Sequence, residues 1–332
     1  MDIVTGGAGF IGSHLVDRLL AQGRRVKVID SLVSGHLRNL EQHKNNSNLE
    51  LIVADITDQS RMMKEFENVE RVFHLAARAD IVPSIQNPLE YYRSNVDGTI
   101  SVLEAARFHK VKRFIYSASS SCYGFPEKFP TPEDSDIDTQ YPYALTKSLG
   151  EQLVMHWHKI YKIPANSLRF FNVYGPRART SGTYGAVFGV FLAQLLANKP
   201  LTIVGDGNQT RDFTFVSDIV DAILCTVNSS ACGEIFNVGS GREPVAVNRL
   251  VELLGAKETT HIPKRPGEPD QTWADVSKIR SVLKWHAKVP IEDGVKIMLE
   301  NINYWKEAPV WTPESIADAT RVWFTYLESE SV

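Results

Sequence analysis

A phenol and an ammonium group lie four residues apart in this sequence, at Tyr143 and Lys147, near the start of a segment with helical periodicity. The spacing places them one turn apart on the same helix face. A chain of this composition contains about 0.6 such pairs by chance, so the spacing alone is weak evidence. A serine-rich loop over residues 117–121 strengthens it, because this loop follows a predicted parallel strand, at the carboxyl edge where such sheets bind ligands.

A glycine-rich turn near the amino terminus joins a predicted first strand to a predicted helix. Its glycines Gly6, Gly9 and Gly12 recur every three residues. Such a turn lets the backbone approach a pyrophosphate without a Cβ in the way, and the helix amino terminus points free N–H groups at the anion. Asp30 ends the predicted second strand, where a carboxylate accepts hydrogen bonds from ribose hydroxyls and repels a 2′-phosphate. The pattern therefore predicts a bound dinucleotide, NAD in preference to NADP.

The elements that must position these residues alternate in βαβ order. Apolar, β-branched runs predict strands near residues 3–4, 26–29, 49–54, 72–75, 114–116 and 167–171. Helical periodicity predicts helices over residues 10–21, 88–109 and 143–161. Because the strands are apolar on both faces, they predict a parallel sheet covered by helices on each side, which is a doubly wound Rossmann α/β fold.

The second half of the chain has shorter elements and more turns. We assign residues 1–171 to an NAD-binding domain and residues 172–307 to a smaller α/β substrate-binding domain. Residues 213–240 again have helix and strand patterns, so we expect them to pack back on the first domain.

The carboxyl end, residues 308–332, is predicted to form a helical extension. Thr312 is the expected N-cap and Pro313 the first helical residue. An apolar stripe predicts that the helix is buried against the body of the protein or a sister subunit. The stripe consists of Ile316, Ala319, Val322, Trp323 and Tyr326.

Composition excludes several classes of protein. The 332 residues suffice for two domains with a large core. A net charge of -3 leaves no cation excess for nucleic acid. The longest nearly apolar stretch, residues 184–197, is shorter than the roughly 20 residues that a membrane crossing requires. The three cysteines, Cys122, Cys225 and Cys232, show no metal-ligand spacing. We therefore expect a cytoplasmic protein without a signal peptide, a metal, a nucleic-acid partner or a membrane association.

These motifs together resemble the extended short-chain dehydrogenase/reductase family. The resemblance is carried by the glycine turn, Asp30, the segments 74–77, 117–124 and 169–176, and Tyr143 with Lys147. Within the family the chain most resembles nucleotide-sugar 4-epimerases of the UDP-glucose 4-epimerase type, from Ile3 to about Trp305. It departs from them in a shorter first strand and in the tail from about Ala308.

The resemblance implies an activity and an assembly. A nucleotide sugar, UDP-hexose or UDP-N-acetylhexosamine, is oxidised at C4 with NAD to a 4-keto sugar and returned as the C4 epimer, in a pathway such as polysaccharide biosynthesis. The family also implies a homodimer, formed through the helices that follow Pro88 and Tyr143.

Site residues follow by the same resemblance. Tyr143 is the general base, Lys147 holds the nicotinamide ribose and lowers the pKa of Tyr143, and Ser119 hydrogen-bonds the reacting sugar oxygen. A cation at about 4 Å supplies roughly 4 kcal/mol at an effective dielectric constant of about 20, enough to bring a phenol from a pKa of about 10 to near 7. The implied cofactor-binding residues are these two and Gly6, Gly9, Phe10, Ile11, Gly12, Asp30, Asp55, Ile56, Leu75, Ala76, Ala77, Asn95 and Ser117. The implied substrate-binding residues are Ser84, Ser119, Ser121, Asn172, Arg211, Arg265, Glu268 and Thr272.

Alternative activities stay open at this stage. Related 4,6-dehydratases carry an Asp-Glu pair at the positions of Ser120 and Ser121, and UDP-glucuronate decarboxylases carry a glutamate at the second of them, so both serines favour epimerisation. A non-catalytic NAD-binding scaffold or sensor is a more remote alternative, because it does not need the serine, tyrosine and lysine together. Thr272 stands where some epimerases carry a bulky tyrosine, which predicts room for an N-acetyl group.

Overall fold

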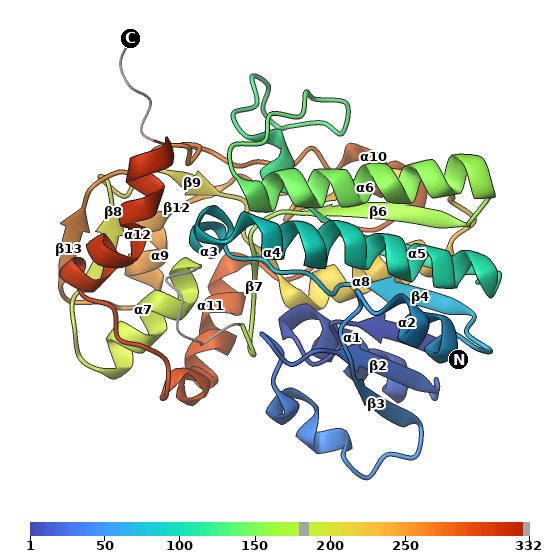
Figure 1. The fold of residues 1–332 in the computed structure, drawn as a ribbon. Helices are drawn as coiled ribbons and strands as arrows, with labels where there is room; N and C mark the ends of the chain where they lie inside the picture. The colour runs from blue at the N-terminus through green and yellow to red at the C-terminus, as the bar shows by residue number, and fades with distance from the viewer. Residues whose placement is uncertain (179–185, 328–332) are drawn as a thin grey trace.

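A seven-stranded sheet forms the larger lobe in this computed structural model, which describes residues 1–178 and 186–327 (Figure 1). Its order is β11-β6-β5-β4-β1-β2-β3, and every neighbouring pair is parallel. The strands are β1 (Asp2–Thr5), β2 (Val26–Asp30), β3 (Leu49–Val53), β4 (Arg71–His74), β5 (Arg113–Ser119), β6 (Ala165–Phe170) and β11 (Ile235–Val238). Strands β2 and β3 are added on one side of β1, and β4, β5 and β6 on its other side. A ligand crevice is expected where this order reverses, at the carboxyl ends of β1 and β4.

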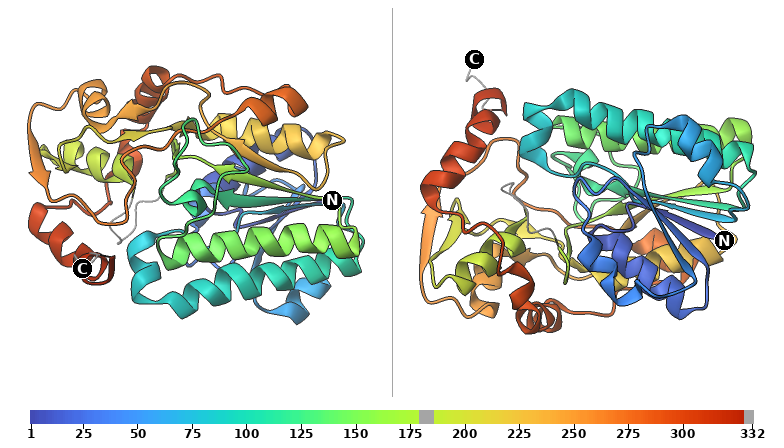
Figure 2. Two further views of the ribbon diagram at one scale, coloured as in Figure 1. Left: turned by 90° about the horizontal axis from the view of Figure 1, so that it is seen from above. Right: turned by 60° about the horizontal axis from the view of Figure 1, so that its bottom comes forward.

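Helices cover both faces of this sheet, which confirms the predicted doubly wound α/β fold. On one face α2 packs on α5, and α5 and α6 lie side by side, while α1 and α8 lie together on the other (Figures 1 and 2). The helices of this lobe are α1 (Phe10–Ala21), α2 (Gln59–Glu65), α3 (Ile81–Gln86), α4 (Pro88–Tyr92), α5 (Gly98–Phe108), α6 (Pro142–Tyr161) and α8 (Val216–Asn228), with 3₁₀ turns over Leu37–His43 and Ser120–Tyr123.

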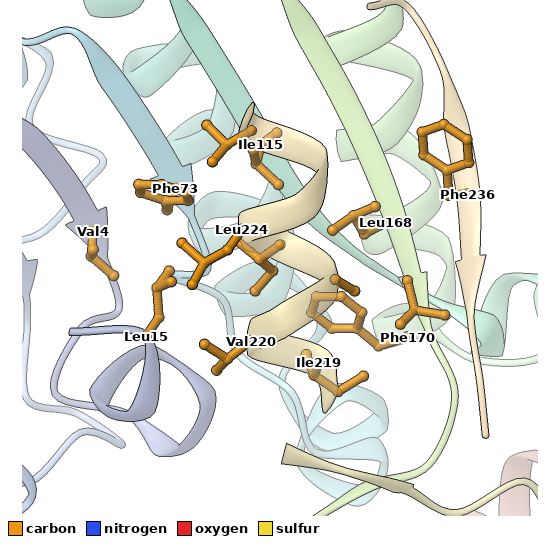
Figure 3. Packing of buried hydrophobic residues seen from close by; sticks show 14 of the residues in the cluster. Val4, Leu15, Phe73, Ile115, Leu168, Phe170, Ile219, Val220, Leu224 and Phe236 are labelled. Carbon is orange, nitrogen blue, oxygen red and sulfur yellow. The ribbon is translucent and has the colours of Figure 1, made fainter. Parts of the chain in front are cut away.

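Apolar side chains on each face of the sheet explain why it is buried on both sides. Figure 3 shows the cluster between the sheet and the helices α1 and α8, where Val4, Leu15, Phe73 and Leu224 meet. A second cluster on the opposite face includes Phe114. Both clusters join residues far apart in the chain, so packing fixes the strand order.

Segments from the second half of the chain complete the larger lobe. Strand β11 pairs with β6, with Phe236 opposite Leu168. Helix α8 precedes it and packs against α1 and β5. The helix and strand expected within residues 213–240 therefore belong to the main sheet layer.

A smaller lobe is built around a separate apolar cluster. Its centre is aromatic, with the rings of Tyr174 and Phe188 stacked at 4.7 Å between centroids. Its helices are α7 (Val187–Leu196), α9 (Val247–Leu253), α11 (Ile291–Glu300) and α12 (Pro313–Leu327), with a 3₁₀ turn over Ile302–Trp305, whereas α10 (Ser277–Leu283) packs on β11 of the larger lobe. Its short strands are β7 (Val173–Tyr174), β8 (Leu201–Val204), β9 (Thr210–Arg211), β10 (Thr214–Phe215), β12 (Val245–Ala246) and β13 (Thr259–Ile262).

Three expectations about helices need comment. Tyr184 and Gly185 of the apolar stretch 184–197 lie outside the described residues, and the remainder contains α7. The expected single helix over residues 88–109 is instead α4 and α5 joined by a π-helical turn over Arg93–Asp97. No helix among the described residues is long and apolar enough to cross a membrane.

The expected apolar stripe of the carboxyl-terminal helix α12 is only partly buried. Thr312 caps the helix by accepting a hydrogen bond from the Ser315 backbone N–H at 3.2 Å. Ile316 and Trp323 are each 2% exposed. Tyr326 is 71% exposed, so the body of this chain does not bury it, because it contacts only a narrow stripe of the helix.

The close contact between α6 and β5 yields a prediction for Gly150. A Cβ built there lies 2.2 Å from the Tyr116 hydroxyl oxygen and 2.9 Å from its Cζ. Alanine usually stabilises a helix by about 1 kcal/mol relative to glycine. We expect the opposite for G150A, a loss of about 2 kcal/mol in the free energy of unfolding, because the methyl group overpacks the interface. Urea denaturation measures it.

Y116F is the matched second change, since it removes the nearest clashing atom. The double variant G150A/Y116F should recover part of the stability lost in G150A. A G150A protein as stable as the parent would contradict this account of the interface.

Candidate active site

The glycine turn between β1 and α1 is tightly packed at Gly6 and Gly12 and open at Gly9. A Cβ at Gly12 would lie 2.1 Å from the Gly6 carbonyl oxygen, and one at Gly6, where φ is +72°, would lie 2.7 Å from the Ala76 backbone nitrogen. Among the described residues, a Cβ at Gly9 meets only the Gly6 oxygen, at 3.1 Å. No side chain in the described part of the chain caps α1, so its first N–H groups are available to an anion.

The amino-terminal turn of α1 carries Phe10 and Ile11, two residues predicted to bind the cofactor. Both are partly buried, and the Phe10 ring contacts His14 edge to face at 6.0 Å between centroids. Their backbone N–H groups belong to the open end of the helix. They are therefore placed to contribute main-chain donors and apolar surface.

Asp30 closes β2 directly beside this turn. Its carboxylate accepts hydrogen bonds from the backbone N–H groups of Ala8 and Leu32, each at 2.9 Å. Burial raises the pKa of this carboxyl, and the two hydrogen bonds oppose that rise. The carboxylate is thus fixed against the glycine turn, as a ribose-binding acid requires.

Other predicted cofactor residues line the carboxyl ends of neighbouring strands. Leu75, Ala76 and Ala77 follow β4, and Ser117 lies in β5, the next strand. Asp55 lies after β3, where its carboxylate accepts hydrogen bonds at 2.9 Å from the backbone N–H and the hydroxyl of Thr57. Ile56, beside it, is 5% exposed. The structure therefore gathers these residues along one edge of the sheet.

Asn95 differs from the other predicted cofactor residues. It lies in the π-helical turn, is 1% exposed, and binds the backbone of Arg78 at both N (2.8 Å) and O (3.0 Å). Its amide also donates to the Thr146 hydroxyl at 3.0 Å. All its polar atoms are engaged, so the structure favours a role in joining the loop after β4 to α6 over direct contact with a cofactor.

A chain of hydroxyl groups connects the serine loop with Tyr143. Ser119 is the last residue of β5, and its side chain is near enough to the Tyr143 hydroxyl to lower the pKa of that phenol. Its Oγ also lies 2.8 Å from Ser121 Oγ. Ser121 is hydrogen-bonded to the Tyr141 hydroxyl, and the rings of Tyr141 and Tyr143 are parallel with centroids 6.4 Å apart. The sequence had not singled out Tyr141, although its place two residues before Tyr143 was a signal for it.

Lys147 is buried and lies one turn after Tyr143 on α6. Its ammonium lies 4.3 Å from the centroid of the Tyr116 ring. Burial lowers the pKa of Lys147 to about 7, and the Glu151 carboxylate raises it in part. His74 is a buried neighbour whose pKa burial lowers to about 3, with a further contribution from Lys147. His74 is therefore neutral at physiological pH. Its Nδ1 and Nε2 atoms are hydrogen-bonded to the hydroxyls of Thr5 and Thr99, at 2.7 and 3.0 Å.

The expected lowering of the Tyr143 pKa by Lys147 needs a correction. Burial is the largest influence and raises the pKa of Tyr143, and the hydrogen bond with Ser119 partly opposes it. Attraction between the ammonium and the phenolate is opposed by desolvation, which disfavours both charged groups. Ionisation of Tyr143 therefore depends on the hydrogen bond and on charge that a ligand brings.

A buried ion pair that sequence analysis missed holds α6 against β6. Arg169 Nη2 lies 2.6 Å from Glu151 Oε1, and both side chains are at most 7% exposed. The Ser167 hydroxyl donates to the same carboxylate at 2.8 Å, and Arg169 donates to the Tyr123 hydroxyl at 2.7 Å. Glu151 lies one helical turn after Lys147, which was the available signal.

Two arginines predicted to bind the substrate meet at one carboxylate in the smaller lobe. Glu268 lies 3.1 Å from Arg211 and 3.7 Å from Arg265. Both arginine side chains are nearly buried, at 10% and 11% exposed. Guanidinium groups suit a diphosphate, and Glu268 is placed to orient the two of them.

Asn172 and Thr272 are also brought together. The Thr272 hydroxyl donates to Asn172 Oδ1 at 2.6 Å and accepts from the backbone N–H of Asp212 at 3.1 Å. This leaves the Thr272 methyl group, and no hydroxyl proton, for a ligand. Ser84 is not part of such a cluster: it is fully buried, and its hydroxyl donates to the Ile81 carbonyl of its own helix at 2.6 Å. The structure therefore favours a helix-stabilising role for Ser84 over contact with a sugar.

The arrangement supports a specific kind of chemistry. One edge of the sheet offers a glycine turn with an uncapped helix start and the carboxylate of Asp30, and beside it stand a buried lysine and a tyrosine next to Ser119. Two arginines lie across from them in the other lobe. Such a site can bind a dinucleotide and a phosphorylated ligand together, and can move a proton at a hydroxyl group between them.

Similarity to known proteins agrees with this geometry. The NAD dependent epimerase/dehydratase family matches residues 3–239. UDP-glucose 4-epimerase of Mycolicibacterium smegmatis is 37% identical, covering 90% of this chain and 97% of that protein. UDP-glucose 4-epimerase of Thermotoga maritima, solved with UDP-glucose, is 36% identical with a TM-score of 0.85, covering 91% of this chain and 99% of that one. UDP-N-acetylglucosamine 4-epimerase of Methanobrevibacter ruminantium, solved with UDP-N-acetylmuramic acid, is 32% identical with a TM-score of 0.84, covering 90% and 98%.

These matches extend over most of the chain and agree with the resemblance found in the sequence. The glycine turn, the serine loop and the Tyr143–Lys147 pair all lie within the matched residues. The chain belongs to the NAD dependent epimerase/dehydratase family.

Proposed function

We propose that this protein is an NAD-dependent epimerase that inverts C4 of a nucleotide sugar, a UDP-hexose or a UDP-N-acetylhexosamine, through a 4-keto intermediate. The observation that carries the proposal is the placement of Ser119 at the carboxyl edge of β5 next to Tyr143 and the buried Lys147, which lie one helical turn apart on α6. Relatives with these names and with similar length and fold support the choice of reaction.

The residues around the glycine turn fit NAD. Gly9 leaves room for a pyrophosphate, Gly6 and Gly12 let the turn pack closely on the backbone beneath it, and Asp30 is assigned to the adenosine ribose. Lys147 is assigned to the nicotinamide ribose. When bound, the cofactor supplies the acceptor and donor of hydride at the sugar C4, and the protein supplies position and charge.

Proton transfer is the task of Tyr143. Its phenolate takes the proton of the sugar 4-hydroxyl, and the phenol returns that proton when the carbonyl is reduced. Ser119 stabilises the phenolate and hydrogen-bonds the same sugar oxygen. The 4-keto sugar turns about its phosphate linkage between the two hydride transfers, so both faces of C4 are presented to one base.

Epimerisation is favoured over elimination and decarboxylation by the serine loop. Elimination of water needs a base that removes the proton from the carbon next to the 4-keto group, and decarboxylation needs an acid that protonates that carbon after carbon dioxide has left. Here Ser120 and Ser121 follow the loop hydroxyl, and Ser121 is hydrogen-bonded to Ser119 and Tyr141. A hydroxyl group has too high a pKa to move a proton at carbon in either reaction, which favours reduction of the 4-keto intermediate.

Arg211 and Arg265, held by Glu268, are assigned to the diphosphate and nucleoside. Asn172 joins them through its hydrogen bond with Thr272, and the small Thr272 side chain leaves space beside the sugar C2 for an acetamido group. The larger lobe is accordingly the NAD-binding domain, residues 1–171, and residues 172–307 form the substrate-binding domain, with residues 213–240 returning to the first.

We also infer a cytoplasmic homodimer that serves polysaccharide biosynthesis. Helices α4, α5 and α6 expose apolar side chains that point away from the sheet, which supports a dimer through this surface. They are Leu89, Tyr92, Phe108, Leu145, Ile160 and Tyr161. The free thiols of Cys122, Cys225 and Cys232 support a reducing compartment.

The central test is turnover by the protein and its Y143F variant. UDP-glucose and UDP-N-acetylglucosamine are each expected to yield the C4 epimer without a change of mass, measured by chromatography and mass spectrometry. Y143F should lower kcat by about a thousandfold, because no base remains, while bound NAD stays unchanged. Y326F, at an exposed tyrosine of α12 outside the proposed dimer surface, is the matched control and should retain full activity.

Three results would count against the proposal. Loss of water or carbon dioxide from the substrate would show that the reaction is elimination or decarboxylation. A Y143F protein with near-normal kcat would show that Tyr143 is not the base. Turnover of plain UDP-glucose alone would contradict the space for an acetamido group that is assigned to the position of Thr272.

The pH profile tests the bond between Ser119 and Tyr143. Because Tyr143 acts as phenolate, kcat rises with pH through its pKa, and the Ser119 hydrogen bond lowers that pKa. Removing the bond in S119A should raise the pKa, so the acidic limb moves to higher pH by about one unit. S120A keeps the bond and should leave the limb in place. A limb at the same pH in S119A would refute the assignment.

The dimer is tested by sedimentation equilibrium. The protein should sediment at twice the 37.2 kDa of one chain. Replacing Leu89 and Ile160 together by glutamate should give monomers, because the charges would be buried without partners at the interface. F125E changes an apolar side chain elsewhere, 50% exposed, and should leave the dimer intact. A monomeric parent protein at micromolar concentration would exclude this interface.

A further inference from the structure

The carboxyl-terminal helix α12 is anchored in the smaller lobe and reaches toward the larger one. Ile316 is buried in the apolar cluster of the smaller lobe, and the Gln194 side chain donates to the Trp311 carbonyl just before the helix at 2.8 Å. The rest of α12 packs beside α3 of the larger lobe (Figures 1 and 2). The helix thus spans the two lobes next to the site assigned to the substrate, and it lies outside the residues that the family model matches.

Trp323 is the residue of α12 that contacts this site. Its ring faces the guanidinium of Arg265, with 5.4 Å between Cζ and the ring centroid. Its indole N–H donates to the Pro266 carbonyl at 2.6 Å. Trp323 is 2% exposed, so both contacts are shielded from water. The ring and the N–H therefore hold one arginine and the backbone next to it.

A second contact connects Trp323 with the proton-transfer residues. Its ring lies 6.4 Å from the Tyr141 ring, between centroids, at 58°. Tyr141 in turn is parallel to Tyr143 and hydrogen-bonded to Ser121. One side chain of α12 thus touches both the arginine loop and the aromatic pair that begins α6.

These contacts do more than bury apolar surface. An arginine side chain has many rotamers, and a guanidinium that must meet a diphosphate binds more tightly when those rotamers are restricted beforehand. Stacking on an indole and the 3.7 Å approach to Glu268 fix Arg265 from two sides. An aliphatic residue at position 323 would fill space without orienting the cation.

We propose that Trp323 is a positioning residue of the nucleotide-sugar site, which holds Arg265 for the diphosphate, so that α12 completes this site within the same chain. The inference rests on the proposed function, because that function assigns Arg265 to the diphosphate. Trp323 touches neither the sugar C4 nor the glycine turn in this account. Its effect is therefore on substrate binding, and the chemical step and NAD retention are independent of it.

The test compares W323A, W323F and Y326A in the full-length protein. Titration calorimetry with UDP should give a Kd about tenfold higher for W323A, because the cation–π contact and the hydrogen bond are both lost. The KM for the nucleotide sugar should rise by the same factor, with kcat and bound NAD within about twofold. W323F keeps an aromatic face and loses only the N–H, so its Kd should rise by about threefold. Y326A alters an exposed aromatic residue of the same helix and should behave as the parent.

A double-mutant cycle separates orientation of Arg265 from general packing. R265A weakens UDP binding, and adding W323F or W323A to it should cost less than about twofold more, since the oriented group is gone. Circular dichroism checks folding, and W323F carries the test if W323A is unfolded.

The outcomes distinguish this inference from the proposed function. Unchanged UDP affinity in W323F and W323A, or a full additional loss in the R265A background, would overturn the positioning role. A fall in kcat with constant KM would do so too. A parent protein that binds UDP but epimerises no UDP-sugar would contradict the proposed function, and the UDP titrations would still decide the role of Trp323.

Discussion

The buried ion pair between Arg169 and Glu151 is the contact on which the geometry of the candidate site depends. It fastens α6, which carries Tyr143 and Lys147, to β6, the neighbour of the strand that ends at Ser119. Removing one partner of such a pair costs about 3–5 kcal/mol, because the other charge remains buried alone. Helix α6 therefore cannot shift along the sheet at low cost, and the hydrogen bond between Tyr143 and Ser119 follows from its position.

Burial has more influence on the protonation states of Tyr143 and Lys147 than electrostatic attraction between charged groups does. It raises the pKa of Tyr143 and lowers that of Lys147 to about 7, so both groups tend toward their neutral forms. His74 beside them is neutral as well, with a pKa of about 3. A ligand that brings positive charge to Tyr143 favours its phenolate. Tyr143 is consequently easier to ionise when such a ligand fills the site than when the site is empty.

Local sequence patterns were sufficient for the fold and for the elements that carry the candidate site. The glycine turn, Asp30 and the Tyr143–Lys147 pair depend on backbone conformation or helix spacing, which a sequence displays directly. The π-helical turn around Asn95 was missed, because its geometry depends on bonds to Arg78 and Thr146 from other segments. Contacts such as those of Trp323, and the sharing of Glu268 by two arginines, form only when distant segments meet, and no local pattern encodes them.

An enzyme that interconverts two C4 epimers must hold both with similar affinity, which constrains where its binding energy is placed. Charged contacts in the proposed site, from Arg211 and Arg265, lie at the diphosphate, which is identical in the two epimers. At the reacting carbon the protein offers hydroxyl groups of Ser119 and Tyr143, which both donate and accept hydrogen bonds and so serve an alcohol or a ketone. Tight binding at the nucleotide end leaves the sugar free to turn over. A tryptophan that orients Arg265 therefore strengthens binding without favouring either epimer.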